Sequence, residues 1–226
     1  MLGQMNRFAP SAGRPKTWLA LECGAVFLGV PAAIAARWAP VPVIPVLLGM
    51  TAGCWLTLEW QHNIRVWSLL RPQVSGHEWR RMLVLYLIVL PGLVGLLWWM
   101  HPSLIFALLC HQPGFWLLIL LAYPILSVLP QELIFRAFFF ERYRPLFGRG
   151  PGMALASALV FAFGHVVFHN PVAVVLTFVG GWRFATTYQR TSSLICVSTE
   201  HALYGCTLFT IGYGPFFVDR VWWVGG

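Results

Sequence analysis

The sequence is poor in charge, because only 10% of its 226 residues are Asp, Glu, Lys or Arg while 58% are hydrophobic. A soluble domain carries about 25% charged and roughly 45–50% apolar residues, so this composition excludes an ordinary soluble enzyme. Acidic residues are the scarcest, with seven against 15 basic ones and a net charge of +8. The basic residues flank apolar runs and form no basic patch, which predicts contact with a lipid bilayer and no nucleic-acid partner.

Disulfide and metal motifs are also missing. The five cysteines are odd in number, lie within apolar runs and form no Cys-x-x-Cys pair, which is typical of buried free thiols. No His-Glu-x-x-His sequence occurs, although that motif marks many zinc peptidases. No cleavable signal peptide is evident at the polar, basic N-terminus.

Long apolar runs predict an all-α fold, a polytopic bundle of about seven transmembrane helices and possibly eight. About 20 apolar residues cross a bilayer, and roughly 17 suffice. A further run, Ser103–Cys110, is too short to span and is expected to be interfacial or re-entrant, and the aromatic end Tyr213–Gly226 should lie in the interface. We expect a single integral membrane domain over residues 1–226. The seven runs are Trp18–Ala36, Val41–Trp60, Met82–Met100, Pro113–Tyr143, Gly152–His169, Val172–Tyr188 and Ser193–Gly212.

Arginine and lysine set the predicted orientation of these helices. They gather before the first run and in every second connection, while the opposite connections carry almost none. By the positive-inside rule, the basic connections and an N-terminal tail over residues 1–17 are cytoplasmic.

Two of the seven acids, Glu132 and Glu200, fall well inside apolar runs. An ionisable side chain at membrane depth costs several kcal/mol, so it faces protein or a water-filled cavity. Glu132 and Arg136 are i,i+4 neighbours with the acid first, the favourable order for an ion pair on a helix. Such a pair is either a structural ion pair, in which the two charges neutralise each other, or part of a functional site. Pro130 suits a first helical turn, which predicts a broken helix that carries this motif.

Histidines occur in two further apolar runs. His165 and His169 share a helical face, which is compatible with metal ligands, but no acid lies nearby in the sequence. Glu200 and His201 point about 100° apart on a helix, so one should face the site and the other a neighbouring helix. The rise per residue puts Glu132, His165 and His201 roughly 12–20 Å from the cytoplasmic ends of their helices. Three helices should therefore bring one carboxylate and two imidazoles to one level.

These residues resemble the CPBP (Abi) family, which includes CAAX prenyl endopeptidases and bacteriocin-processing or self-immunity proteins. Gln131-Glu132-x-x-x-Arg136 is similar to the first motif of the family, Phe161-x-x-x-His165 to the second, and His201 opens the third. The resemblance covers roughly residues 113–214, which would be the catalytic half. Aromatic and basic residues at 138–143 resemble a bacterial branch, which implies a bacterial inner-membrane location.

The resemblance implies a glutamic-type intramembrane endopeptidase without a metal cofactor. In such an enzyme Glu132 and His165 would activate a water, and His201 would donate to the developing oxyanion. Two positions depart from the pattern. The first Glu of the family, usually assigned to water activation, is Gln131 here, and the Asn of the third motif falls on Gly205. Glu132 would then have to serve as the base.

Other residues receive supporting roles on the same resemblance. Arg136 and Gln131 would support Glu132, and Tyr204 is a candidate second donor to the oxyanion. The substrate would be a membrane-anchored peptide or protein, cleaved near its cytoplasmic end. The candidates for contact with this substrate in the cavity are Phe161, Glu200 and His169.

Three other interpretations stay open at this point. Glu132, His165 and His201 could bind zinc, since two histidines and one glutamate form a known ligand set with an open position. The two departures favour a catalytically weakened protein that acts in immunity or binds a membrane partner. Buried polar residues could also form a proton relay in a small transporter, although the sequence has no inverted repeat.

Overall fold

The computed structural model describes residues 15–36, 42–70 and 74–217. Within these ranges the chain consists of helices and short connections without strands, which confirms the all-α fold. Most of the predicted N-terminal tail, together with Trp222 and Trp223 of the predicted interfacial end, lies outside the described residues. The α-helices are α1 Lys16–Gly24, α2 Val30–Ala35, α3 Val43–Gln61, α4 Val66–Leu69, α5 Gly76–Met100, α6 Ala107–His111, α7 Pro113–Tyr123, α8 Leu129–Glu132, α9 Phe139–Arg142, α10 Arg144–Phe147, α11 Pro151–Gly164, α12 Pro171–Thr191 and α13 Leu194–Ile211.

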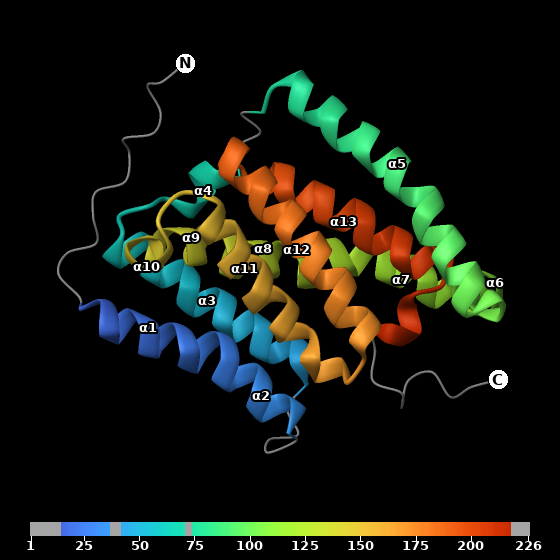
Figure 1. Cartoon of the computed structure of the whole chain (residues 1–226), viewed down its shortest axis with the longest axis horizontal. Coiled ribbons are helices and arrows are strands. Elements are labelled where there is room, and N and C mark those ends of the chain that lie inside the picture. Colours follow the sequence, from blue (N-terminus) through green and yellow to red (C-terminus); the bar gives the residue numbers. More distant parts are fainter. Residues whose placement is uncertain (1–14, 37–41, 71–73, 218–226) are drawn as a thin grey trace.

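Some of these elements follow one another without a break, and six continuous helical segments of the described residues are long and apolar enough to cross a membrane. They are Lys16–Ala35, Val43–Gln61, Gly76–Met100, Pro113–Arg142, Pro151–Phe168 and Leu194–Ile211. The outer ones bury little against the protein, with 11% of the most apolar stretch of α5 buried against 44% of that of α11. Large apolar side chains on the outside, such as Trp60 and Trp99, are mostly exposed. Lipid tails would cover such a surface in a membrane. Figure 1 shows α5 along one edge of the bundle and α1 with α2 along the opposite edge.

The predicted span Val172–Tyr188 forms α12, a helix of 21 residues that is not among those six. At 1.5 Å per residue its length of about 31 Å suffices to cross a bilayer. Polar side chains lower its hydropathy, since it contains Arg183, Gln189 and Arg190. It packs along α11. The short run before Pro113 forms only α6 and a single 3-10 turn, as its length predicted.

The segment that carries the first motif is one continuous helix, Pro113–Arg142, and is not broken at Pro130 as predicted. Two π-helical stretches, Pro124–Val128 and Leu133–Phe138, lie within it. Proline lacks an N–H and crowds the carbonyl of the preceding turn, and a wider π turn can absorb that defect without ending the helix. This helix runs through the middle of the bundle (Figure 1).

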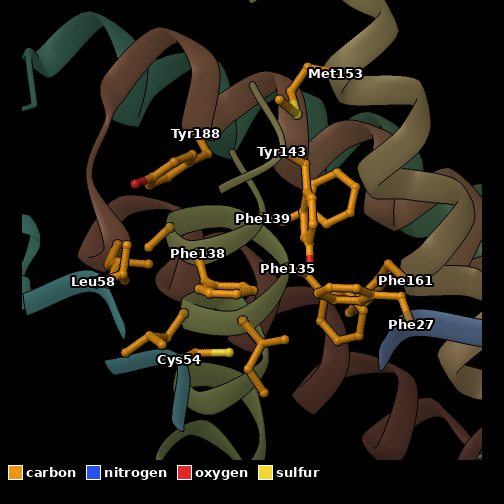
Figure 2. Close-up of a cluster of buried hydrophobic side chains, with 14 of the residues drawn as sticks. Phe27, Cys54, Leu58, Phe135, Phe138, Phe139, Tyr143, Met153, Phe161 and Tyr188 are labelled. Carbon is orange, nitrogen blue, oxygen red and sulfur yellow. The ribbon is translucent and has the colours of Figure 1, made fainter. Parts of the chain in front are cut away.

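Aromatic rings hold the C-terminal part of this helix in place. Phe27, between α1 and α2, packs edge-on against Phe139 and Tyr143 at centroid distances of 5.2 and 5.8 Å. Phe135 meets Phe161 of α11 in the same way at 5.2 Å. Figure 2 shows Phe135 and Phe161 close together beside Phe27. Such edge-to-face pairs add to the stabilisation from apolar burial, so three helices are fixed around the motif.

Two acids outside the first motif, Glu22 and Glu141, are partly or fully buried in ion pairs. Glu22 accepts hydrogen bonds from Arg142 Nε at 2.8 Å and Nη2 at 2.6 Å and from the Tyr143 hydroxyl at 3.1 Å. Glu141 is buried and pairs with Arg144. The sequence hides both pairs because their positions near predicted helix ends suggest contact with water. The first pair ties α1 to the end of α9.

Replacement of Gly212 by alanine should destabilise the fold by about 3 kcal/mol. Gly212 ends α13 with a φ of +120°, and a Cβ there would lie 2.0 Å from the carbonyl oxygen of Leu104. Both the backbone and the neighbouring loop would have to shift. Thermal unfolding in detergent micelles measures the effect. The matched control is Gly95→Ala, because a Cβ at Gly95 meets nothing within 4 Å; equal loss in both variants would contradict the prediction.

Candidate active site

Glu132 lies at the end of α8 with no exposed surface. Its Oε1 lies 2.7 Å from Nδ1 of His201 on α13, and its Oε2 lies 3.1 Å from Nε of Arg136. A buried carboxylate is tolerated when it is paired and hydrogen-bonded. The structure therefore joins two of the three predicted catalytic residues directly, together with the predicted supporting arginine.

Arg136 has no exposed surface and is held by contacts with two neighbouring helices. Its Nη2 donates to the carbonyl oxygen of Gly181 on α12 at 3.3 Å, and its guanidinium lies 4.5 Å above the Phe161 ring centre. A Cβ at Gly181 would lie 2.9 Å from the Phe161 ring, so a glycine at this position lets α12 pack closely against that ring. Arg136 thus supplies a fixed positive charge behind Glu132.

The contact with Glu132 fixes the tautomer of His201. A carboxylate only accepts hydrogen bonds, so Nδ1 of His201 carries the proton and donates it to Glu132. Nε2 is then an acceptor, and the hydroxyl of Tyr123 lies 3.2 Å from it. The ring of Phe184 stacks on the imidazole at 4.6 Å with an angle of 20°. The imidazole is therefore held by one hydrogen bond at each nitrogen and by an aromatic ring on one face.

His165 stands where α11 passes into a 3-10 turn. Its Nδ1 donates to the carbonyl oxygen of Phe161 at 2.8 Å, which leaves Nε2 as an acceptor. The Phe161 ring packs against both predicted catalytic imidazoles, with centroid distances of 4.7 Å to His165 and 5.6 Å to His201. Phe161 is thus a spacer between the two histidines.

Both imidazoles line a cavity of about 1210 Å³ whose walls come from the π-helical stretch Ala25–Gly29 and from α2, α3, α5, α7, α8, α11, α12 and α13. The walls are mostly apolar, and a few polar groups converge on them, as is usual for a ligand site. Gln131 is part of this wall, whereas Glu132 is not. The wall residues with polar side chains are Tyr123, Ser127, Gln131, His165, His169, Thr177, Arg183, His201 and Tyr204.

Glu200 and His201 diverge as their spacing predicted. His201 faces Glu132 and the cavity, while Glu200 lies 2.6 Å from Nη2 of Arg183 on α12. Glu200 has no exposed surface and does not belong to the cavity wall. The structure therefore places it in an ion pair between helices and away from the substrate position expected from the sequence.

The remaining candidates, His169 and Tyr204, also lie on the cavity wall. His169 has a left-handed backbone with a φ of +51° after the 3-10 turn, so it does not continue the helical face of His165 as the spacing suggested. Tyr204 packs on the rings of Tyr86 and Phe184. Both line the cavity, but neither hydrogen-bonds to Glu132 or His201 in the described part of the chain.

A preformed metal site is absent from the described residues, since no three His, Cys, Asp or Glu side chains gather there in a way that could hold an ion. Glu132 is instead engaged by Arg136 and by Nδ1 of His201. The proposed zinc ligand set of Glu132, His165 and His201 therefore finds no matching geometry within those ranges.

Tyr123 is the site residue that the sequence did not reveal. It ends α7, lines the cavity and contacts His201. Within an apolar run a tyrosine is an ordinary membrane residue, and its partner is 78 positions away. The one signal in the sequence was Gly205, which stands where the third motif of the family has an asparagine. This glycine leaves room for the ring of Tyr123.

Comparison with known proteins identifies one part of the chain. Residues 113–207 match the family model described as type II CAAX prenyl endopeptidase Rce1-like. No curated protein and no solved structure matches the chain. Over this segment the match bears out the resemblance inferred from the motifs and supports a CAAX-type intramembrane protease in general terms. The span of the match contains Tyr123, Glu132, Arg136, His165 and His201.

Proposed function

We propose, from the premise that residues 113–207 belong to the Rce1-like branch of the CPBP family, that this protein is an intramembrane endopeptidase. Its substrate is a membrane-anchored peptide or protein. The residue that activates the attacking water is His201, whose imidazole is held by Glu132. The observation that carries the proposal is the hydrogen bond of 2.7 Å between these two side chains, made on a cavity wall inside an apolar bundle. The six apolar helices make the protein an integral membrane protein.

In the proposed reaction, His201 contacts the water and Glu132 acts through His201. Glu132 has no exposed surface, so it is not placed to take a proton from a water in the cavity. It keeps the proton of His201 on Nδ1 and stabilises the imidazolium that forms when Nε2 accepts a proton, as the acid does in a catalytic triad. The water oxygen then attacks the peptide carbonyl carbon, and the carbonyl oxygen becomes an oxyanion.

His165 is assigned to the same water, which it would contact from the other side. Its Nδ1 is occupied by Phe161, and its Nε2 is available as an acceptor on the cavity wall. This division of roles differs from the one implied by the resemblance, where Glu132 and His165 hold the water and His201 donates. The buried position of Glu132 is the reason for the change.

The proposed orientation follows the basic connections. Arg142 is the last residue of α9, and Arg144 and Arg149 follow before α11 begins. Arg190 lies near the end of α12. By the positive-inside rule this end of the bundle and the N-terminus face the cytoplasm, in a bacterial inner membrane on the earlier resemblance. The substrate would be cut on that side of the bilayer centre.

The test uses the purified chain in lipid vesicles with a quenched fluorescent peptide that carries a farnesyl-cysteine near its C-terminus. The same peptide without the farnesyl group reports whether a lipid anchor is needed. His201→Gln should lower kcat by about 10³-fold or more, since it removes the proton acceptor, and His165→Gln should lower it by about 10²-fold. Full activity of His201→Gln would overturn the proposal, provided the variant unfolds at the temperature of the wild type.

One observation favours a second function, namely that Gln131 and not a carboxylate faces the cavity. Its Nε2 donates to Ser127 at 2.7 Å, and its Oε1 has no hydrogen-bond partner among the described residues. An amide in this position suits the recognition of a peptide N–H without chemistry. A protein that binds the reporter peptide without cutting it, and that begins to cut it after Gln131→Glu, would be a membrane-partner or immunity protein.

A further inference from the structure

We infer that Tyr123 is a catalytic residue of the proposed peptidase and that its hydroxyl is the donor that stabilises the oxyanion. This inference rests on the proposed function. It begins from the position of the hydroxyl, which lines the cavity and lies 3.2 Å from Nε2 of His201. Because Nδ1 of His201 carries the proton, Tyr123 is the donor in this contact. The distance is at the long end of the hydrogen-bond range, so a water or substrate group can displace it at little cost.

Gly205 is the structural reason why the tyrosine reaches this place. A Cβ at Gly205 would lie 2.4 Å from Cε1 and 2.5 Å from the hydroxyl oxygen of Tyr123. No side chain at position 205 is compatible with the present position of the ring. Glycine weakens a helix interior, and its presence in the middle of α13 is explained by this close approach. The ring and hydroxyl of Tyr123 therefore fill the space that a side chain at 205 would otherwise occupy.

The position of Tyr123 is fixed by a second contact between the same helices. Trp116, two turns earlier on α7, donates its Nε1 to Thr210 Oγ1 on α13 at 3.0 Å. The ring of Phe209 packs edge-on against Tyr123 at 5.4 Å. α7 and α13 thus lie antiparallel and are tied at two levels, and Figure 1 shows them adjacent. The ring and the hydroxyl oxygen of Tyr123 are therefore held in place, and only its O–H bond has to rotate to meet a developing charge.

The proposed step balances its protons as follows. Nε2 of His201 takes one proton from the attacking water, and the oxygen of that water forms a bond to the carbonyl carbon of the peptide. The π electrons of the carbonyl bond move to its oxygen. Protonated Nε2 can no longer accept from Tyr123, so the O–H of Tyr123 turns to the new oxyanion and donates to it. The oxyanion then re-forms the carbonyl bond, the C–N bond breaks, and the proton on Nε2 of His201 passes to the nitrogen of the leaving amine.

The test is Tyr123→Phe, which removes the hydroxyl and keeps the ring beside Gly205. In vesicles with the farnesylated reporter, kcat should fall by about 10²–10³-fold while KM changes little, as when one oxyanion donor is removed. A reporter-derived peptide aldehyde, whose hydrate resembles the tetrahedral intermediate, should inhibit the variant more weakly by a similar factor. A structural role alone would not change the aldehyde and the parent peptide differently.

The matched control is Tyr86→Phe, which removes a hydroxyl bonded to Thr207 on the same helix α13 at 2.7 Å but outside the cavity wall. This variant should keep the wild-type kcat. Gly205→Ala should lower kcat by displacing Tyr123, and it should add no further loss to Tyr123→Phe. Wild-type kcat in Tyr123→Phe, with an active parent, overturns this inference alone. A parent chain that cuts no reporter overturns the proposed function and this inference with it.

Discussion

Glu132→Gln should lower the kcat of peptide cleavage by about 10³–10⁴-fold. The amide nitrogen of glutamine can donate to Nδ1 of His201, which would move the proton to Nε2 and remove the acceptor that faces the cavity. The corresponding change in a catalytic triad costs about 10⁴-fold for the same reason. The KM for the reporter should change little, because Glu132 does not belong to the cavity wall.

Glu141→Gln is the matched control for this variant. Glu141 lies on the same continuous helix, is buried, pairs with Arg144 and lies 3.8 Å from Nδ1 of His62. It therefore combines a buried carboxylate, an arginine and a histidine, but none of these lines the cavity. Both variants should lose stability, and only Glu132→Gln should lose activity per folded molecule. Equal losses of activity would show that Glu132 matters for the fold alone.

The second large effect concerns the ion pair of Glu200 and Arg183 between α13 and α12. Glu200→Leu should destabilise the protein by about 3–5 kcal/mol, because it leaves the guanidinium of Arg183 without its buried partner. Glu200 has no exposed surface, and the side chain of Arg183 is 19% exposed. Thermal or chemical unfolding in detergent micelles measures the change in the free energy of unfolding.

The double variant Glu200→Leu with Arg183→Leu should recover most of that loss. Replacement of both members of a buried pair by apolar residues of similar size is often neutral or stabilising. The difference between the double variant and the sum of the two single variants gives the coupling energy. A double variant as unstable as that sum would mean that the two side chains act independently. Neither outcome depends on whether the chain cuts peptides.

The sequence predicted the site residues best where ionisable side chains lie within apolar runs. Glu132 and Arg136 were recognisable as a pair because ionisable side chains at membrane depth need partners, and the structure confirms the contact. The divergence of Glu200 and His201 followed from helix geometry alone. Depth along the helices also brought Glu132 and His201 to the same level, although the 2.7 Å contact depends on packing between helices that no periodicity encodes.

Other features depend on tertiary packing and were missed or wrong. The π-helical stretches around Pro130 replace the predicted break, because neighbouring helices hold the wider turns in place: Ser157 of α11 donates to the carbonyl oxygen of Phe135 at 2.9 Å. Glu22 lies near the start of the first predicted span, and nothing in the sequence marks its partner Arg142, which lies 120 positions later. Tyr123 carries no chemical mark that separates it from other membrane tyrosines.

The polar residues of the cavity wall come from only one part of the chain. All the polar wall residues lie between Tyr123 and Tyr204, inside the segment that matches the family model. The N-terminal helices lie outside that segment and contribute apolar wall, with side chains such as Val30, Leu47 and Met50. Substitution in those helices can reshape what fits beside the two imidazoles while every polar group of the wall stays in position. The shape of the cavity can therefore vary independently of its polar groups.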